Sequence, residues 1–365
     1  MAGFIIGLLG AANHFYEPHV PLYLGVVAWG INMVLVLILA ATPAGARIGV
    51  LISGLFLAVT CFVRAPALFR ALLMCFAVMP LGIASAAVLF PEIIGFRARL
   101  YFLCTWGFTR EVKRRAYGFD RVALVQLIAA TAIFTASSAG VEIISGVGVW
   151  MFARLLALGI AILALAEIVT ACHIFLTALM GLTAPALMQS PYLSTSVNEF
   201  WNKRWNPAVS MLFRSFCFKP LARHGVLKAM FVAFFVSGIA HALLVFTAIG
   251  TWGYSLANGA FFCVQPVFII IEHRMKIRLW RPVTRRIWTI SVLAITSPLF
   301  TAPVLHVVER SWGKSGNAML PNLLPVTVFA ISFVVFIVVF FSLASLASCP
   351  EQRPSHTTPQ AKLAS

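Results

Sequence analysis

The chain has 365 residues, of which 61% are hydrophobic and only 10% are charged, and this composition excludes an ordinary soluble domain. Lys and Arg number 27 against 10 Asp and Glu, which gives a formal net charge of +17. These basic residues gather beside long apolar stretches, as they do on the cytoplasmic side of membrane proteins. We therefore predict membrane lipids, and no nucleic acid, as the partners of this charge.

Apolar stretches that suit a bilayer crossing, which takes about 20 residues in helical form, recur along the chain. They lie at about 20–41, 48–63, 68–90, 122–137, 149–171, 226–250, 253–271, 287–308 and 323–347, and residues 3–12 are a candidate for a further or half-inserted segment. The predicted fold class is all-α: a polytopic integral membrane protein with about nine transmembrane helices.

Two polar segments interrupt the apolar pattern. Residues 91–121 alternate aromatic and basic side chains, which suits an interfacial helix or loop. Prolines divide residues 181–228 into pieces, which predicts short interfacial helices and turns with no regular span. We interpret residues 1–348 as one membrane-embedded domain, and the Pro, Ser, Thr and Gln-rich tail 349–365 as disordered.

The basic residues also predict an orientation. If the segments 97–121, 203–228 and 274–286 and the C-terminal tail face the cytoplasm, most of the 27 Lys and Arg residues lie on one side. This places the N-terminus outside and the C-terminus in the cytoplasm. The membrane is then a bacterial inner membrane or the endoplasmic reticulum, and the sequence leaves the oligomeric state open.

The seven cysteines show no pair at metal-ligand spacing: Cys61, Cys75, Cys104, Cys172, Cys217, Cys263 and Cys349. Most fall within or beside apolar stretches, where Cys behaves as a small hydrophobe. We predict no disulfide, no metal and no bound cofactor.

Ionisable residues inside apolar stretches are expensive and indicate function. His241 is the best case, near the middle of the stretch from 226 to 250. Ser237 and Gly238 precede it by one helical turn and predict an open pocket above the imidazole. A structural hydrogen bond to a neighbouring helix is the alternative. Glu167 and His173 lie at the end of an earlier span, where we predict interfacial positions.

A polar and aromatic segment precedes this span. Residues 196–206, here called the signature segment, read Ser196-x-x-Glu199-Phe200-Trp201-x-Lys203-Arg204-Trp205-Asn206, and His241 follows 35 positions later behind Val-Ser-Gly. This order resembles the membrane-bound O-acyltransferase superfamily, and within it the wax synthase-like branch. The motif evidence covers about 190–275. The chain departs from many plant members at Ala242, where they have Glu, and at Asn202, where Gly is frequent.

The resemblance implies a catalytic base at His241 and a second signature residue at Asn206, which places substrate or lines an intramembrane reaction chamber. The reaction is transfer of an acyl group from acyl-CoA, as co-substrate, to a lipophilic alcohol, giving wax-ester or sterol-ester products. The residue chemistry agrees, since a neutral imidazole can take a hydroxyl proton near pH 7. The sequence shows no Ser-His-Asp set, which favours direct transfer without an acyl-enzyme.

Further side chains are predicted to bind substrate: Trp201, Trp205, Lys203, Arg204, Ser237, Gln265 and Glu272. The two tryptophans would pack at the mouth of the chamber. Lys203 and Arg204, followed by Arg214 and Lys219, would meet the phosphates of acyl-CoA, although membrane anchoring explains the same cations. Gln265 and Glu272 share one helix face. Glu272 has an alternative as an interfacial ion pair with Arg274, Lys276 or Arg278.

Two alternatives stay open on the sequence. A polytopic lipid or small-molecule transporter would also have many spans and a few intramembrane polar groups, but it predicts half-helices or a repeat in hydropathy, which the sequence lacks. The same fold acting on a polyketide, sugar or protein hydroxyl would use identical pocket chemistry.

Overall fold

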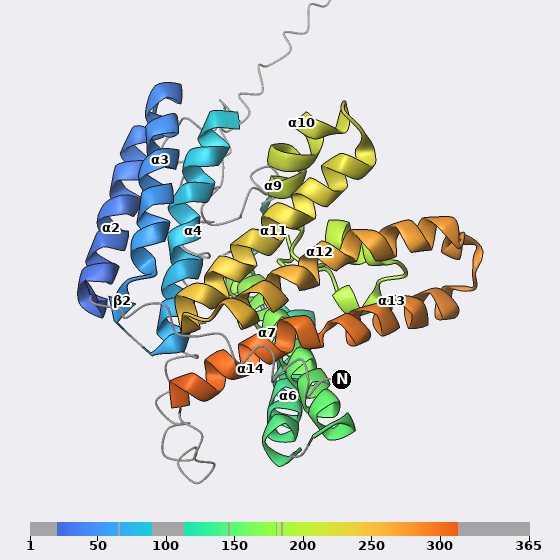
Figure 1. Cartoon of the computed structure of the whole chain (residues 1–365). Coiled ribbons are helices and arrows are strands. Elements are labelled where there is room, and N and C mark those ends of the chain that lie inside the picture. Colours follow the sequence, from blue (N-terminus) through green and yellow to red (C-terminus); the bar gives the residue numbers. More distant parts are fainter. Residues whose placement is uncertain are drawn as a thin grey trace, which may run out of the picture.

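Long helices dominate the computed structural model, which describes residues 20–64, 66–89, 113–144, 147–179, 181–183 and 185–312. The helices α2 (Leu22–Leu39), α3 (Pro43–Thr60) and α4 (Ala67–Leu89) lie side by side on the left of Figure 1. The helices α6 (Arg121–Ile143) and α7 (Val149–Leu179) form a second pair. The helices α11 (Val226–Ile249) and α12 (Trp252–Arg274) form an antiparallel hairpin against α4.

Local sequence signals set the ends of these helices. Thr42 precedes α3, and its Oγ1 accepts a hydrogen bond from the Gly45 N–H at 3.0 Å. Asp120 caps α6 in the same way through the Ala123 N–H at 3.0 Å. Gly250 ends α11 with a φ of +68°, a left-handed conformation that glycine adopts without strain. The chain can therefore reverse directly into α12.

Short elements connect the long helices. The two-residue strands β1 (Val20–Pro21) and β2 (Val63–Arg64) pair in parallel, and β3 (Lys113–Arg114) pairs antiparallel with β4 (Leu182–Thr183). Six short helical pieces follow β4: η2 (Pro191–Leu193), α8 (Val197–Glu199), η3 (Phe200–Arg204), α9 (Pro207–Phe213), η4 (Arg214–Phe218) and α10 (Lys219–Ala222). The prediction of short helices and turns over 181–228 is confirmed within the described residues.

Six helices are long and apolar enough to cross a membrane, and they confirm six of the predicted spans: α3, α4, α6, α7, α11 and α12. The span predicted at 20–41 corresponds to the apolar helix α2, which is not counted among these six. Such a set of apolar helices is that of a multi-pass integral membrane protein. The predicted segments 3–12 and 323–347, most of 91–121, and the tail 349–365 lie outside the described residues.

The span predicted at 287–308 is made of two helices. The structure has α13 (Pro282–Thr296) and α14 (Pro298–Trp312), which are bent by 48° at the break between them. Pro298 explains the break, because its ring carries no N–H and clashes with the preceding turn. If the bent pair counts as one span, the candidate spans in the described part of the chain number 7.

The apolar core joins helices that are distant in the sequence. A buried cluster brings together one end of α4 with α11, α12 and α14, and consists of Ala67, Ala71, Val245, Ala248, Ile249, Tyr254 and Val307. Helix α14 also packs on α7 and α12. The hairpin α11–α12 is thus held from both sides, and it carries His241.

Candidate active site

The imidazole of His241 is held by its own helix. Its Nδ1 lies 2.8 Å from the carbonyl oxygen of Ser237, one turn earlier in α11. A carbonyl oxygen can only accept, so Nδ1 carries the hydrogen of the neutral ring and Nε2 keeps the lone pair. The half-buried ring therefore presents a proton acceptor at Nε2. Ser237, predicted to bind substrate, contributes its carbonyl to this geometry.

The predicted open pocket at Gly238 is wrong. A Cβ added at Gly238 would lie 2.7 Å from the carbonyl oxygen of Gly259 in α12, and one added at Gly259 would lie 3.0 Å from the carbonyl oxygen of Gly238. The two glycines therefore let the backbones of α11 and α12 touch, as small residues do between membrane helices. Close approach fills the space that the sequence had suggested was open.

Gly238→Ala is expected to destabilise the folded protein by about 1–3 kcal/mol, because the new methyl group forces the two helices apart. Thermal unfolding of the purified protein in detergent measures the effect. Gly54→Ala in α3 is the matched control, since nothing lies within 4 Å of its added Cβ. Equal melting temperatures for the two variants would contradict the close crossing.

Aromatic rings surround His241 and connect it to the signature segment. The imidazole stacks on Phe262 with ring centroids 3.9 Å apart, and Phe300 of α14 lies 6.5 Å away. Trp201 meets the same Phe262 at 5.5 Å and Phe234 of α11 at 6.1 Å. The structure thus brings the signature segment and the intramembrane histidine to one phenylalanine. Neither Phe262 nor Phe300 had a sequence signal, because both look like ordinary apolar span residues.

Gln265 and Glu272 both face the signature segment, as their spacing on one helix face predicts. Gln265 is fully buried, and its Oε1 accepts from Trp201 Nε1 at 3.2 Å. Its Nε2 donates to the Phe261 carbonyl at 3.0 Å and to Thr296 Oγ1 at 3.3 Å. Gln265 therefore fixes the Trp201 indole with hydrogen bonds inside the protein.

Glu272 binds the start of the signature segment through hydrogen bonds. Its Oε1 accepts from the Val197 N–H at 2.7 Å and from Trp288 Nε1 at 3.0 Å. The alternative ion pair with Arg274, Lys276 or Arg278 is wrong, since the structure describes all three cations and pairs none of them with Glu272. Glu272 instead joins α12, α13 and the signature segment.

Asn206 ends the signature segment in a left-handed conformation, with a φ of +43° and a ψ of +69°. Its Oδ1 accepts from the Val209 N–H at 3.3 Å and so caps α9, while its own N–H lies 3.1 Å from Met188 Sδ. The preceding turn η3 is a π-helix, closed by the Trp205 N–H on the Phe200 carbonyl at 2.8 Å. The Trp205 ring stacks on Phe200 with centroids 5.7 Å apart. Wide turns of this kind are frequent at functional sites.

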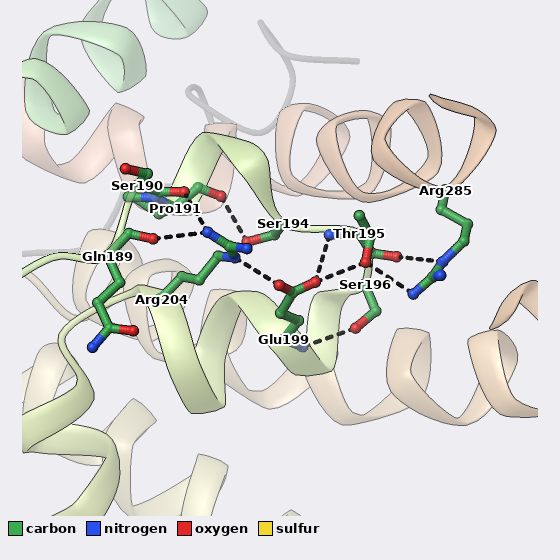
Figure 2. Close-up of polar contacts among 9 residues, drawn as sticks. All are labelled: Gln189, Ser190, Pro191, Ser194, Thr195, Ser196, Glu199, Arg204 and Arg285. Atoms are coloured by element: carbon green, nitrogen blue, oxygen red, sulfur yellow. Dashed lines mark hydrogen bonds and ion pairs between the residues drawn. The ribbon is translucent and has the colours of Figure 1, made fainter. Parts of the chain in front are cut away.

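The predicted phosphate ligands have different surroundings. Arg204 is engaged inside the fold, since its Nε donates to Glu199 Oε1 at 2.7 Å and its Nη1 to the Gln189 carbonyl at 3.0 Å (Figure 2). Lys203, Arg214 and Lys219 are exposed. The phosphate role therefore stays a prediction for these three exposed cations, and Arg204 is better explained as part of the loop structure.

Glu199 lies between Thr195 and Arg204 in the same network (Figure 2). Burial would raise the pKa of this carboxyl, but hydrogen bonds from the Thr195 N–H and hydroxyl, together with the Arg204 guanidinium, outweigh it and lower the pKa to about 2. Glu199 is therefore ionised at any physiological pH.

Glu199→Gln is expected to flatten the acid limb of the stability profile. The folded pKa lies below the ordinary value of 4.5, so the ionised carboxylate stabilises the fold above that pH, and the contribution is lost as the pH falls toward about 2. Thermal unfolding at pH values between about 5 and 2 measures the slope. The exposed Glu142 supplies the control variant Glu142→Gln, which should keep the wild-type slope.

Two earlier candidates lie elsewhere. The helix α7 continues to Leu179, so Glu167 and His173 lie inside it and are buried within the protein, while their position at the membrane interface stays a prediction. Glu167 Oε2 accepts from Gln126 Nε2 at 2.6 Å, across the α6–α7 pair.

Comparison with known proteins identifies the segment that carries this geometry. Residues 184–264 match the model of the membrane bound O-acyl transferase family. Among curated relatives from Arabidopsis thaliana, probable long-chain-alcohol O-fatty-acyltransferase 2 is 36% identical over 130 residues, which cover 32% of this chain and 36% of the relative. Probable long-chain-alcohol O-fatty-acyltransferase 1 is 32% identical over 155 residues, covering 37% and 44%.

Each of these alignments spans less than half of the relative's own length. The matched segment nevertheless contains the signature segment, with Asn206 at its end, and His241. The fold brings Trp201 of the signature segment and His241 to the same phenylalanine, Phe262. The resemblance of this chain to the wax synthase-like branch of the membrane-bound O-acyltransferases is therefore confirmed.

Proposed function

We propose that the chain is a membrane O-acyltransferase that moves an acyl group from acyl-CoA to a lipophilic alcohol, with His241 as the base. The observation that carries the proposal is the hydrogen bond from His241 Nδ1 to the Ser237 carbonyl, because it leaves Nε2 as the acceptor. The names of the relatives support a long-chain alcohol as the acceptor and a fatty acyl group as the cargo. A sterol is the second acceptor of the same lipophilic class.

In this mechanism Nε2 removes the hydroxyl proton while the alcohol oxygen attacks the thioester carbonyl carbon. The tetrahedral intermediate then collapses as its carbon–sulfur bond breaks. The departing sulfur takes the proton from Nε2, which releases the ester and the CoA thiol and restores the neutral imidazole. No acyl-enzyme is formed, and no further reactant is needed.

The surrounding residues would assist this chemistry. The Asn206 carboxamide or the Trp205 indole N–H would donate to the developing oxyanion. The rings of Trp201, Phe262 and Phe300 would keep water away from the thioester in an intramembrane chamber. Lys203, Arg214 and Lys219 would bind the phosphates of acyl-CoA at the chamber mouth.

The decisive experiment incubates membranes that contain the protein with labelled acyl-CoA and a panel of alcohols. Long-chain alcohols and sterols are expected to yield labelled ester, and membranes with His241→Gln should yield none. Ester formed only with polyketide, sugar or peptide hydroxyls would keep the enzyme class and replace the acceptor. Movement of an unreacted substrate across the bilayer, with no ester from any acceptor, would establish a transporter instead.

The proposed orientation has its own test. The contacts of Glu272 with Val197 and of Arg285 with Thr195, just before the signature segment, support one side for the loops around 203 and 280. In a cysteine-free background, Lys203→Cys and Leu279→Cys are expected to react with a membrane-impermeant thiol reagent only from the cytoplasm. Val147→Cys, in the exposed turn between α6 and α7, should react only from outside. Labelling of 203 and 279 from opposite sides would rule out the topology and the proposed entrance for acyl-CoA.

A further inference from the structure

The hydroxyl of Thr195 joins two charged side chains. It donates to Glu199 Oε2 at 2.7 Å, and it accepts from Arg285 Nη2 of α13 at 2.9 Å (Figure 2). A guanidinium has only donors and an ionised carboxylate only acceptors, so the direction of each bond is fixed. Thr195 is thus the relay between Arg285 and Glu199, and neither it nor Arg285 had a role in the sequence prediction.

Glu199 connects Thr195 to Arg204, near the other end of the signature segment. Its Oε1 accepts from Arg204 Nε at 2.7 Å, and Arg204 Nη1 donates to the Gln189 carbonyl at 3.0 Å. The Gln189 N–H returns a hydrogen bond to the Arg204 carbonyl at 2.9 Å. Side chain and main chain of Arg204 therefore bind the same residue of the preceding loop.

Met188, next to the Gln189 that binds Arg204, contacts Asn206. Met188, beside Gln189, receives the Asn206 N–H on its sulfur, and its own N–H donates to Thr170 Oγ1 of α7 at 3.2 Å. A left-handed residue other than glycine costs on the order of 1 kcal/mol and persists where surrounding contacts determine it. Met188, beside Gln189, supplies such a contact for Asn206, which is one of the two residues proposed to donate to the oxyanion.

We infer that Arg285, through the Thr195 hydroxyl, is a positioning residue that holds the turn at Asn206 in the geometry required for acyl transfer. The network runs from α13 through Thr195, Glu199 and Arg204 to the loop at 188–190 and so to Asn206. The catalytic consequence rests on the proposed function, whereas the ordering of the turn does not.

The test uses the full chain in detergent or membranes with two separate readouts. Thr195→Val keeps the shape of the side chain and removes the hydroxyl bonds to Glu199 and Arg285, leaving only the main-chain bonds of residue 195 to both, whereas Thr195→Ser keeps the hydroxyl. Arg285→Lys keeps the charge but loses the planar donor set, and Arg286→Lys changes an exposed neighbour as the matched control. Steady-state kinetics gives kcat and the KM for acyl-CoA. Hydrogen–deuterium exchange over residues 186–207 reports the order of the turn without any assay of activity.

Thr195→Val and Arg285→Lys are each expected to lower kcat by about tenfold to a hundredfold with an unchanged KM, because small displacements in a reacting site cost this much. Exchange over 186–207 should rise in both, while Thr195→Ser and Arg286→Lys stay close to wild type. A raised KM with unchanged kcat in Arg285→Lys would make Arg285 a phosphate ligand and overturn the inference.

Two further outcomes would also overturn it. Faster exchange with unchanged kcat would show that the network orders the loop without serving the reaction, and unchanged exchange would show that it does not order the turn. A wild-type protein that forms no ester with any alcohol would refute the proposed function. Exchange would then still decide whether Thr195 and Arg285 hold the turn.

Discussion

His241→Gln is expected to abolish ester formation while the protein stays inserted and folded. A positioned base contributes roughly 10² to 10⁴ in rate, and the proposed chamber, which excludes water, would offer no substitute for it. Glutamine can keep a hydrogen bond to the Ser237 carbonyl but cannot take a proton near neutral pH. Labelled acyl-CoA and the best alcohol acceptor, in membranes with matched protein levels, provide the measurement.

His224→Gln is the control for this substitution, because His224 is exposed before α11 and is bound to Arg223. It should retain wild-type activity. Full activity in His241→Gln would make His241 a packing residue, and the search for the base would then move to Glu272 and His273.

Asn206→Asp is expected to lower kcat by roughly 10² to 10³, the cost of losing an oxyanion donor. Aspartate keeps the oxygen that caps α9 and tolerates the left-handed backbone, but it has no N–H to donate. Stability should therefore stay near wild type while activity falls. Asn206→Ala mixes the two effects, since it also removes the cap, so the comparison of melting temperature with kcat separates them.

Asn202→Asp adds the same charge in the same segment at an exposed position and should leave kcat unchanged. If Asn206→Asp keeps full activity as well, Asn206 serves only as a helix cap. The oxyanion donor would then be sought at Trp205.

Hydropathy was sufficient to predict six of the membrane helices, because the bilayer imposes one length and one composition on every crossing. The break at Pro298 was missed, since a proline can begin one helix or kink another, and only the packing of α13 and α14 distinguishes them. How the helices pack could not be predicted, because lipid-facing and core-facing residues are equally apolar.

The signature residues were predictable as a group, but their contacts were not. In the sequence Gly238 suggests open space beside His241, whereas in the structure the backbone at Gly259 fills that space. In the sequence Arg204 looks like a cation available to a phosphate, whereas in the structure it binds Glu199 and the Gln189 carbonyl. In both cases the deciding partner lies on a different turn or helix, at a spacing that no local periodicity encodes.

Because η3 is a wide turn, the number of residues in the signature segment must be kept for its contacts to form. Trp201 is anchored to Gln265 on one side, and Asn206 to Met188 on the other. Deleting one residue between them would let the turn close as an ordinary α-helix and would rotate everything after it by about 100° around the helix axis. The contacts of Trp201 with Gln265 and of Asn206 with Met188 could then not form at the same time. A substitution at the exposed position 202 should therefore be tolerated far better than any change in the number of residues between the two anchors.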